Sequence, residues 1–109
     1  MKAILADERI GRLFVAEKAG KLVGMVNLLY TESTALGARV ALLEDMIVEP
    51  KSRSKGIGQG LLDKVYAQCR RDGIKRITLL TDHDNFKAHK FYSRGGFSRS
   101  EMLAFRKNL

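Results

Sequence analysis

The 109-residue sequence predicts one α/β domain, residues 1–109, with a mixed, mostly antiparallel sheet and a central parallel strand–helix–strand unit. Two observations predict this class: an apolar hairpin early in the chain, and a change from strand to helix spacing at Ile57 that is followed by another apolar strand. Apolar residues make up 45% of the chain and charged residues 29%, which is ordinary for a globular domain and excludes disorder as a default. We therefore expect a single core of modest size.

The first half of the chain is expected to form antiparallel strands. Residues 2–12 show a weak helical pattern with few apolar positions, and residues 31–38 are predicted to form a polar loop. The predicted strands of this half are Leu13–Glu17, Leu22–Tyr30 and Arg39–Val48. The first two form a hairpin through the turn 18–21, and the third is almost continuously apolar, as in a strand covered on both faces. Glu44 and Asp45 interrupt the third strand, and a carboxylate in such a place is either paired or functional.

The second half of the chain begins with helical spacing. Apolar residues recur every three or four positions on one helix face, at Ile57, Leu61, Leu62, Val65, Tyr66 and Cys69. Gly73 follows two arginines, where a helix commonly ends. The remaining predicted elements are a strand over Arg76–Thr81, a short helix over Asn85–Arg94, and two closing strands, Phe97–Arg99 and Met102–Arg106. Because a strand that follows such a helix runs parallel to the strand before it, the sheet is predicted to be mixed.

Charge is distributed unevenly along the chain. The net charge is +8, and residues 51–109 carry fourteen Lys/Arg against five Asp/Glu, whereas residues 1–50 carry six against seven. A basic half favours an anionic partner such as nucleic acid, a membrane surface or a phosphorylated cofactor, and a solvated surface is the alternative. Exposed aromatic residues are not interleaved with the basic ones, so the sequence argues against a nucleic-acid partner.

Composition also excludes several classes of protein. No apolar run approaches the roughly 20 residues that cross a bilayer, and the N-terminus turns acidic at Asp7 and Glu8, unlike a signal peptide. Cys69 has no second cysteine to pair with, and one cysteine with two histidines makes a poor metal site. We therefore expect a cytoplasmic protein that uses neither a metal nor a membrane.

The turn between the third strand and the long helix carries the chemistry. Its glycines and basic residues are Gly56, Gly58, Gly60, Lys51, Arg53 and Lys55. Glycine-rich turns of this kind let backbone N–H groups approach an anion, and the helix N-terminus adds partial positive charge. The spacing fits neither the loop of nucleoside-triphosphate hydrolases nor the dinucleotide fingerprint, which needs Gly or Ala where Leu61 stands. The alternative to an anion site is that the glycines serve only a tight turn, and the three flanking cations argue against that alternative.

Two motifs flank the predicted parallel strand Arg76–Thr81. The run Arg53–Gly58 fits an Arg/Gln-x-x-Gly-x-Gly/Ala pattern and follows a strand that ends Val-x-Pro. The run Asn85–Phe97 fits an Asn…Ala…Phe-Tyr…Gly-Phe pattern. With both motifs in this order, the sequence from Leu13 onward resembles the GNAT superfamily of acetyl-CoA-dependent N-acetyltransferases.

The resemblance implies a role for each matching residue. The cofactor-binding residues that it implies are Ile47, Val48, Arg53, Ser54, Lys55, Gly56, Ile57, Gly58, Gln59 and Asn85. The glycine loop would hold the CoA pyrophosphate through its backbone amides. The backbone of Ile47 and Val48 would pair with the pantetheine arm at a splay between the parallel strands, and Asn85 would hydrogen-bond that arm. Tyr92 would face the sulfur and protonate or stabilise the departing thiolate.

Attack on a thioester needs a neutral amine, yet an alkylamine with a pKa of ~10.4 is almost entirely protonated at pH 7. A base must take the proton. The Leu43-Glu44-Asp45 run is similar to that of polyamine and other small-amine acetyltransferases, in which a Glu serves as the base. Strand alternation predicts that Glu44 shares a face with Met46 and Val48, while Asp45 lies on the other face. His83 is the alternative base, although its usual interpretation is a solvated loop residue.

The N-terminal part departs from the family pattern, because few residues precede Leu13 where relatives have a strand and two helices. This shortening predicts an open acceptor side that a second copy of the chain covers, and hence a homodimer. The predicted function is transfer of an acetyl group from acetyl-CoA to a small-molecule amine or polyamine, in a ternary complex. The alternatives are a catalytically inactive acetyl-CoA-binding module and, less favoured, a basic nucleic-acid-binding protein.

Overall fold

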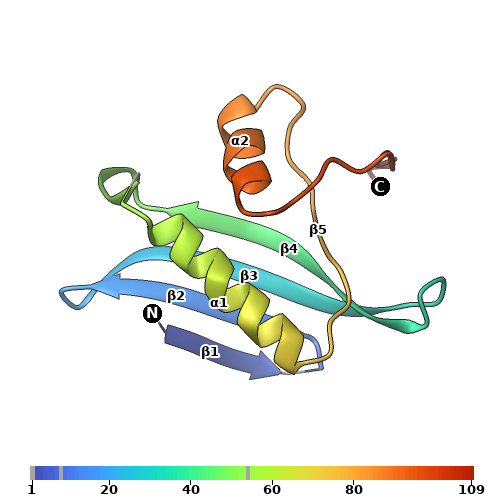
Figure 1. The fold of residues 1–109 in the computed structure, drawn as a ribbon, viewed down its shortest axis with the longest axis horizontal. Coiled ribbons are helices and arrows are strands. Elements are labelled where there is room, and N and C mark those ends of the chain that lie inside the picture. The colour runs from blue at the N-terminus through green and yellow to red at the C-terminus, as the bar shows by residue number, and fades with distance from the viewer. Residues whose placement is uncertain (1, 8, 54) are drawn as a thin grey trace.

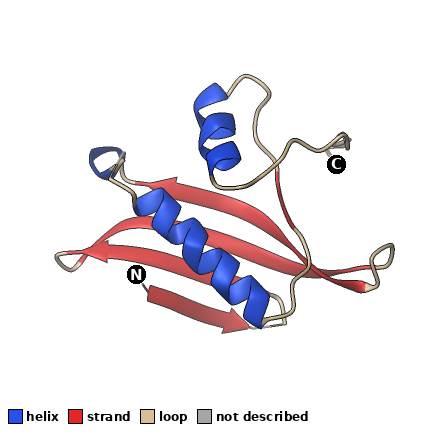
Figure 2. Cartoon of the chain, viewed as in Figure 1, coloured by secondary structure: helices blue, strands red, loops and turns tan. Residues whose placement is uncertain are grey.

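The computed structural model describes residues 2–7, 9–53 and 55–109, and it contains one five-stranded sheet with the strand order β1-β2-β3-β4-β5 (Figures 1 and 2). The strands are β1 (Lys2–Asp7), β2 (Gly11–Lys18), β3 (Lys21–Ser33), β4 (Ala38–Val48) and β5 (Ile77–Leu79). The helices are α1 (Ile57–Arg71) and α2 (Phe86–Arg94), and a 3-10 turn spans Pro50–Ser52. Neighbouring strands from β1 to β4 are antiparallel, whereas β4 and β5 are parallel. The predicted mixed sheet with one parallel unit is confirmed.

Helix α1 crosses one face of the sheet and covers the core (Figure 1). Its buried residues are Leu61, Leu62, Val65 and Cys69, which belong to the face that its spacing predicted. They pack in one cluster with Phe14, Val26, Leu28 and Leu43 of the sheet. Each such side chain contributes roughly 1.5–3 kcal/mol when it leaves water. Gly24 lets the helix approach, because a Cβ there would lie 3.2 Å from Cδ1 of Leu61.

Local turn chemistry explains the ends of these elements. Ala19 and Gly20 both have positive φ, 53° and 75°, as a two-residue hairpin turn requires. At the C-terminus of α1, Gly73 has a φ of 74°, so the predicted helix end is confirmed.

A charged cluster joins that end of α1 to the sheet. The Arg12 guanidinium donates two hydrogen bonds to the Asp72 carboxylate, at 2.8 and 2.9 Å, and the Tyr30 hydroxyl donates a third at 2.6 Å. Burial alone would raise the pKa of Asp72, but the hydrogen bonds from Arg12 and Tyr30 outweigh it and hold this pKa at about 2. The cluster therefore ties β2 and β3 to the helix. No sequence pattern indicated it.

Two predictions about the sheet edges are wrong. The described residues of the segment 2–12, which are 2–7 and 9–12, do not form a helix, because β1 pairs antiparallel with β2. The available strand edge outweighs a weak local helical pattern. The closing strands predicted over 97–99 and 102–106 are absent, since no strand follows β5 in the described part of the chain. There the side chains of Met102 and Phe105 are 85% and 96% exposed. A short hairpin without a packed face is only marginally stable, which accounts for the difference.

Three smaller predictions also need correction. The polar loop is shorter than 31–38, because β3 continues to Ser33 and β4 begins at Ala38. The β5 strand is confined to three of the six predicted residues. Strand β4 is not covered on both faces along its whole length, because Ile47, on the face away from α1, is 56% exposed.

Candidate cofactor and active site

Strands β4 and β5 separate at the point where the site is expected. They pair only where Ala41–Leu43 faces Ile77–Leu79, after which β4 continues to Val48 while β5 has ended. Figure 1 shows the two segments diverging beyond this pairing. The last residues of β4 therefore have no strand partner on this side among the described residues. The predicted splay is present, and it exposes backbone groups that can pair with an extended ligand.

Val48 presents its backbone to the splay. The N–H of Glu49 donates to the carbonyl of Val23 on β3, at 2.8 Å. Because backbone groups alternate in direction along a strand, the N–H and carbonyl of Val48 face away from β3, whereas those of Ile47 face toward it. The Val48 carbonyl accepts a hydrogen bond from Nε of Arg53, at 3.1 Å. By the same alternation the backbone N–H and carbonyl of Met46 also face the splay. The sequence analysis did not include Met46 among the cofactor-binding residues.

A β-bulge changes the position of the predicted base. Leu43 lies opposite Leu28, and Asp45 lies opposite Asn27, so Glu44 is an extra residue with no partner on β3. The regular alternation that placed Glu44 with Met46 is therefore interrupted at this residue. Glu44 and Asp45 are both exposed at the start of the splay. His83, the alternative base, is exposed in the loop between β5 and α2.

The loop after β4 leads into an uncapped helix N-terminus. Lys51, Arg53 and Lys55 are exposed around it, and Ser54 lies outside the described residues. The N-cap residue of α1 is Gly56, which makes no side-chain cap, and the first N–H to donate within the helix is that of Gly60, to the Gly56 carbonyl at 2.9 Å. The N–H groups at the first turn, those of Ile57, Gly58 and Gln59, therefore have no helical acceptor. They can bind an anion, as predicted for a pyrophosphate.

The two motif glycines serve different purposes. Gly56 has a φ of 80°, and a Cβ there would meet no atom within 4 Å, so glycine is needed for its left-handed backbone. A Cβ at Gly58 would lie 3.0 Å from Cζ of Phe91 and 3.5 Å from Cε of Met46. The absence of a side chain at Gly58 thus relieves a tight contact with the Phe91 ring of α2. The Cβ direction of Gly58 points into the protein, whereas the sequence interpretation had explained this glycine by the approach of an anion.

Asn85 and Tyr92 lie at the start and near the end of α2. Asn85 is the N-cap, and its Oδ1 accepts a hydrogen bond from the N–H of Ala88 at 3.3 Å. The side-chain NH2 of Asn85 can donate a hydrogen bond to a ligand. Tyr92 is half-buried between Phe91 and Phe97, with ring centroids at 5.2 and 5.7 Å. Burial raises the pKa of the Tyr92 phenol, which makes it a weaker acid and favours hydrogen-bond donation over full proton transfer.

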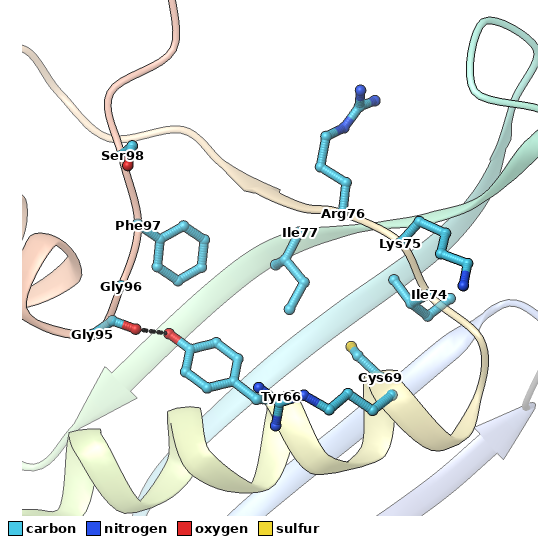
Figure 3. Close-up of a pocket in the computed structure, with 11 residues that line it drawn as sticks. Tyr66, Cys69, Ile74, Lys75, Arg76, Ile77, Gly95, Gly96, Phe97 and Ser98 are labelled. Atoms are coloured by element: carbon cyan, nitrogen blue, oxygen red, sulfur yellow. Dashed lines mark hydrogen bonds between the residues drawn. The ribbon is translucent and has the colours of Figure 1, made fainter.

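A surface groove lies on the far side of Phe97 from the splay and the glycine loop. It measures about 460 Å³ and opens between the C-terminal half of α1, the start of β5 and the segment after α2 (Figure 3). Its apolar lining includes Tyr66, Cys69, Ile74, Ile77 and Phe97. The Tyr66 hydroxyl donates to the Gly95 carbonyl at 2.6 Å along one side. Because the glycine loop is at the other end of α1, this groove is not the predicted cofactor site.

Two further observations bear on cofactors and membranes. Within residues 2–7, 9–53 and 55–109, no three His, Cys, Asp or Glu side chains gather to hold a metal ion. Neither of the described α-helices is long and apolar enough to cross a membrane.

Known proteins share both the sequence pattern and the fold. A family model described as the Acetyltransferase (GNAT) family matches residues 2–97. An uncharacterized N-acetyltransferase of Bacillus subtilis, YhfO, is 34% identical over 85 residues, which are 78% of this chain and 57% of that protein. The D-amino-acid N-acetyltransferase HPA3 of Saccharomyces cerevisiae is 25% identical over 93 residues, 85% of this chain and 58% of its own length.

A solved structure extends the likeness to three dimensions. An integron cassette protein from the mobile metagenome of Cole Harbour Salt Marsh has a TM-score of 0.84 and 26% identity, over 96% of this chain and 64% of that one. The chain thus spans less than two-thirds of each of these proteins.

Proposed function

The chain belongs to the acetyltransferase (GNAT) family, and on this premise we propose that it transfers an acetyl group from acetyl-CoA to a primary amine by direct attack in a ternary complex. The splay between β4 and β5 carries the proposal, because it combines free strand backbone with an uncapped helix N-terminus at its end. An extended, phosphorylated cosubstrate needs both features. The activity and the acceptor are proposals for the whole protein.

The exposed cations and the free backbone groups in the cofactor half of the site support CoA as its ligand. The first-turn N–H groups of α1 and the exposed Arg53 and Lys55 would hold the pyrophosphate. The pantetheine arm would pair with Val48, and Arg53 would exchange its present bond to the Val48 carbonyl for a phosphate contact. The Asn85 amide would donate to the same arm. Acetyl-CoA supplies the activated acetyl group when it is bound.

Two side chains would handle the protons. Glu44, exposed at the bulge, would accept a proton from the incoming ammonium group, directly or through water. Tyr92 would donate a hydrogen bond to the sulfur as negative charge develops there. Its raised pKa supports stabilisation of the thiolate as much as its protonation.

The acceptor would be a small-molecule amine or polyamine, which suits the two exposed carboxylates, Glu44 and Asp45, at the bulge. Release of CoA from acetyl-CoA, followed across a panel of polyamines, amino acids, aminoglycosides and peptide lysines, tests this directly. Stabilisation of the fold by acetyl-CoA with no product from any amine would favour the alternative, a binding module without turnover.

We also propose that the protein is a homodimer. The C-terminal segment 98–109 carries four large apolar side chains that are more than four-fifths exposed, Met102, Leu103, Phe105 and Leu109. Contiguous apolar patches larger than a few hundred Å² are uncommon on monomeric proteins. The segment of one copy would pack against the groove of Figure 3 on the other, where Tyr66, Ile77 and Phe97 supply the apolar part of the lining. Sedimentation that finds only a 12.2 kDa species at full specific activity would overturn this proposal.

A further inference from the structure

Phe91 on α2 lies where the separate parts of the proposed site meet. Cζ and Cε1 of its ring lie 3.0 and 3.1 Å from the position of a Cβ on Gly58, in the first turn of α1. The Cε methyl of Met46, on the splayed part of β4, lies 3.5 Å from the same point. The next residue along α2 is Tyr92, whose ring centroid is 5.2 Å from that of Phe91. Phe91 therefore lies beside the first turn of α1, close to the splayed part of β4, and next to Tyr92 along α2.

The packing around Phe91 leaves little freedom. The ring is half-buried, it packs against the core cluster, and it meets the Tyr92 ring edge-on, with 65° between the ring planes. The missing side chain at Gly58 is what lets the ring come this close to the α1 backbone. Interiors are packed too tightly for such a contact to change without movement of the helices.

We propose that Phe91 is a positioning residue that sets the distance between the N-terminus of α1 and Tyr92. This inference rests on the proposed function, in which acetyl-CoA is held by α1 at its pyrophosphate and met by Tyr92 at its sulfur. Because one molecule must satisfy both ends, a shift of α2 relative to α1 lowers the rate even when binding persists. Phe91 itself touches no reacting atom.

Two double-mutant cycles test the proposal. Gly58→Ala adds a methyl group against the ring, and Phe91→Leu removes the ring atoms that it would meet. Each single change should lower kcat by about tenfold or more, with a smaller change in KM for acetyl-CoA. The kcat of the double variant should be at least about threefold higher than the value predicted by multiplying the two single effects, because the two groups are in contact. In a Tyr92→Phe background, Phe91→Leu should lower kcat by less than about twofold.

Controls separate positioning from general destabilisation. Phe86→Leu makes the same change on the same helix at a 73% exposed position and should leave kcat unchanged. Thermal unfolding of every variant shows which of them are folded at the assay temperature, and Phe91→Met replaces Phe91→Leu if the latter unfolds. Additive effects in the first cycle, or an undiminished effect of Phe91→Leu in the Tyr92→Phe background, would overturn the role of Phe91. A parent protein that binds no CoA would instead overturn the proposed function itself.

Discussion

Replacing Asp72 by Asn should destabilise the protein in a way that depends on pH. The side chains of Arg12 and Asp72 are only 8% and 14% exposed, so the substitution leaves a largely buried guanidinium without its counter-ion. The pKa of about 2 lies nearly two units below the ordinary value of ~3.9 for Asp, and this difference corresponds to roughly 2.5 kcal/mol of folding free energy at neutral pH. We expect Asp72→Asn to cost about 2–4 kcal/mol at pH 7, because Asn keeps the shape but loses the charge.

The sign of the pH dependence follows from the lowered pKa. The stabilisation is complete above the unfolded-state pKa of ~3.9 and is lost as the pH falls through the folded-state value of about 2. Urea unfolding of the parent and of Asp72→Asn at several pH values between 7 and 2 measures the difference, and the other carboxylates cancel in the subtraction. The gap between the two proteins should narrow below about pH 4.

A matched change on the same helix controls for the loss of a negative charge. Asp63→Asn removes an exposed carboxylate that accepts a hydrogen bond from Gln59, and it should change stability by less than about 0.5 kcal/mol at every pH. A parent–variant difference for Asp72→Asn that stays constant down to pH 2 would refute this account of the cluster.

The remaining predictions concern the proposed site. Gly56→Ala should destabilise the protein by about 1 kcal/mol, because the φ of Gly56 is 80°, and Gly56→Asn should destabilise it by less. Chemical denaturation measures both changes, and equal costs would contradict the need for a left-handed backbone at this position. Tyr92→Phe should lower kcat by about 10- to 1000-fold with little change in acetyl-CoA affinity from calorimetry, whereas a loss in affinity alone would remove its role at the sulfur. Glu44→Gln should alter the pH profile of kcat/KM, with Asp45→Asn as its neighbour control, and an unchanged profile would exclude Glu44 as the base.

The sequence by itself determined the elements that depend on local chemistry. The spacing of apolar residues from Ile57 to Cys69 was sufficient for α1, because a helix face repeats every 3.6 residues whatever it packs against. Gly73 and the turn at Ala19–Gly20 marked the ends of elements, since positive φ is a property of single residues. The sequence also predicts an anion site at the glycine loop, because the backbone N–H groups of such a site come from neighbouring positions.

Only the tertiary structure decided the features that depend on partners distant in the chain. The bulge at Glu44 is a matter of register between β3 and β4, and a one-residue shift changes the face of a side chain without any local signal. The tight contact at Gly58 is with Phe91, which is 33 positions away in the numbering and adjacent in space. Strand β1 pairs with the edge of β2, whereas residues 97–106 form no strand even though β5 is an edge of the sheet. Pairing and packing are long-range choices, and local patterns do not encode them.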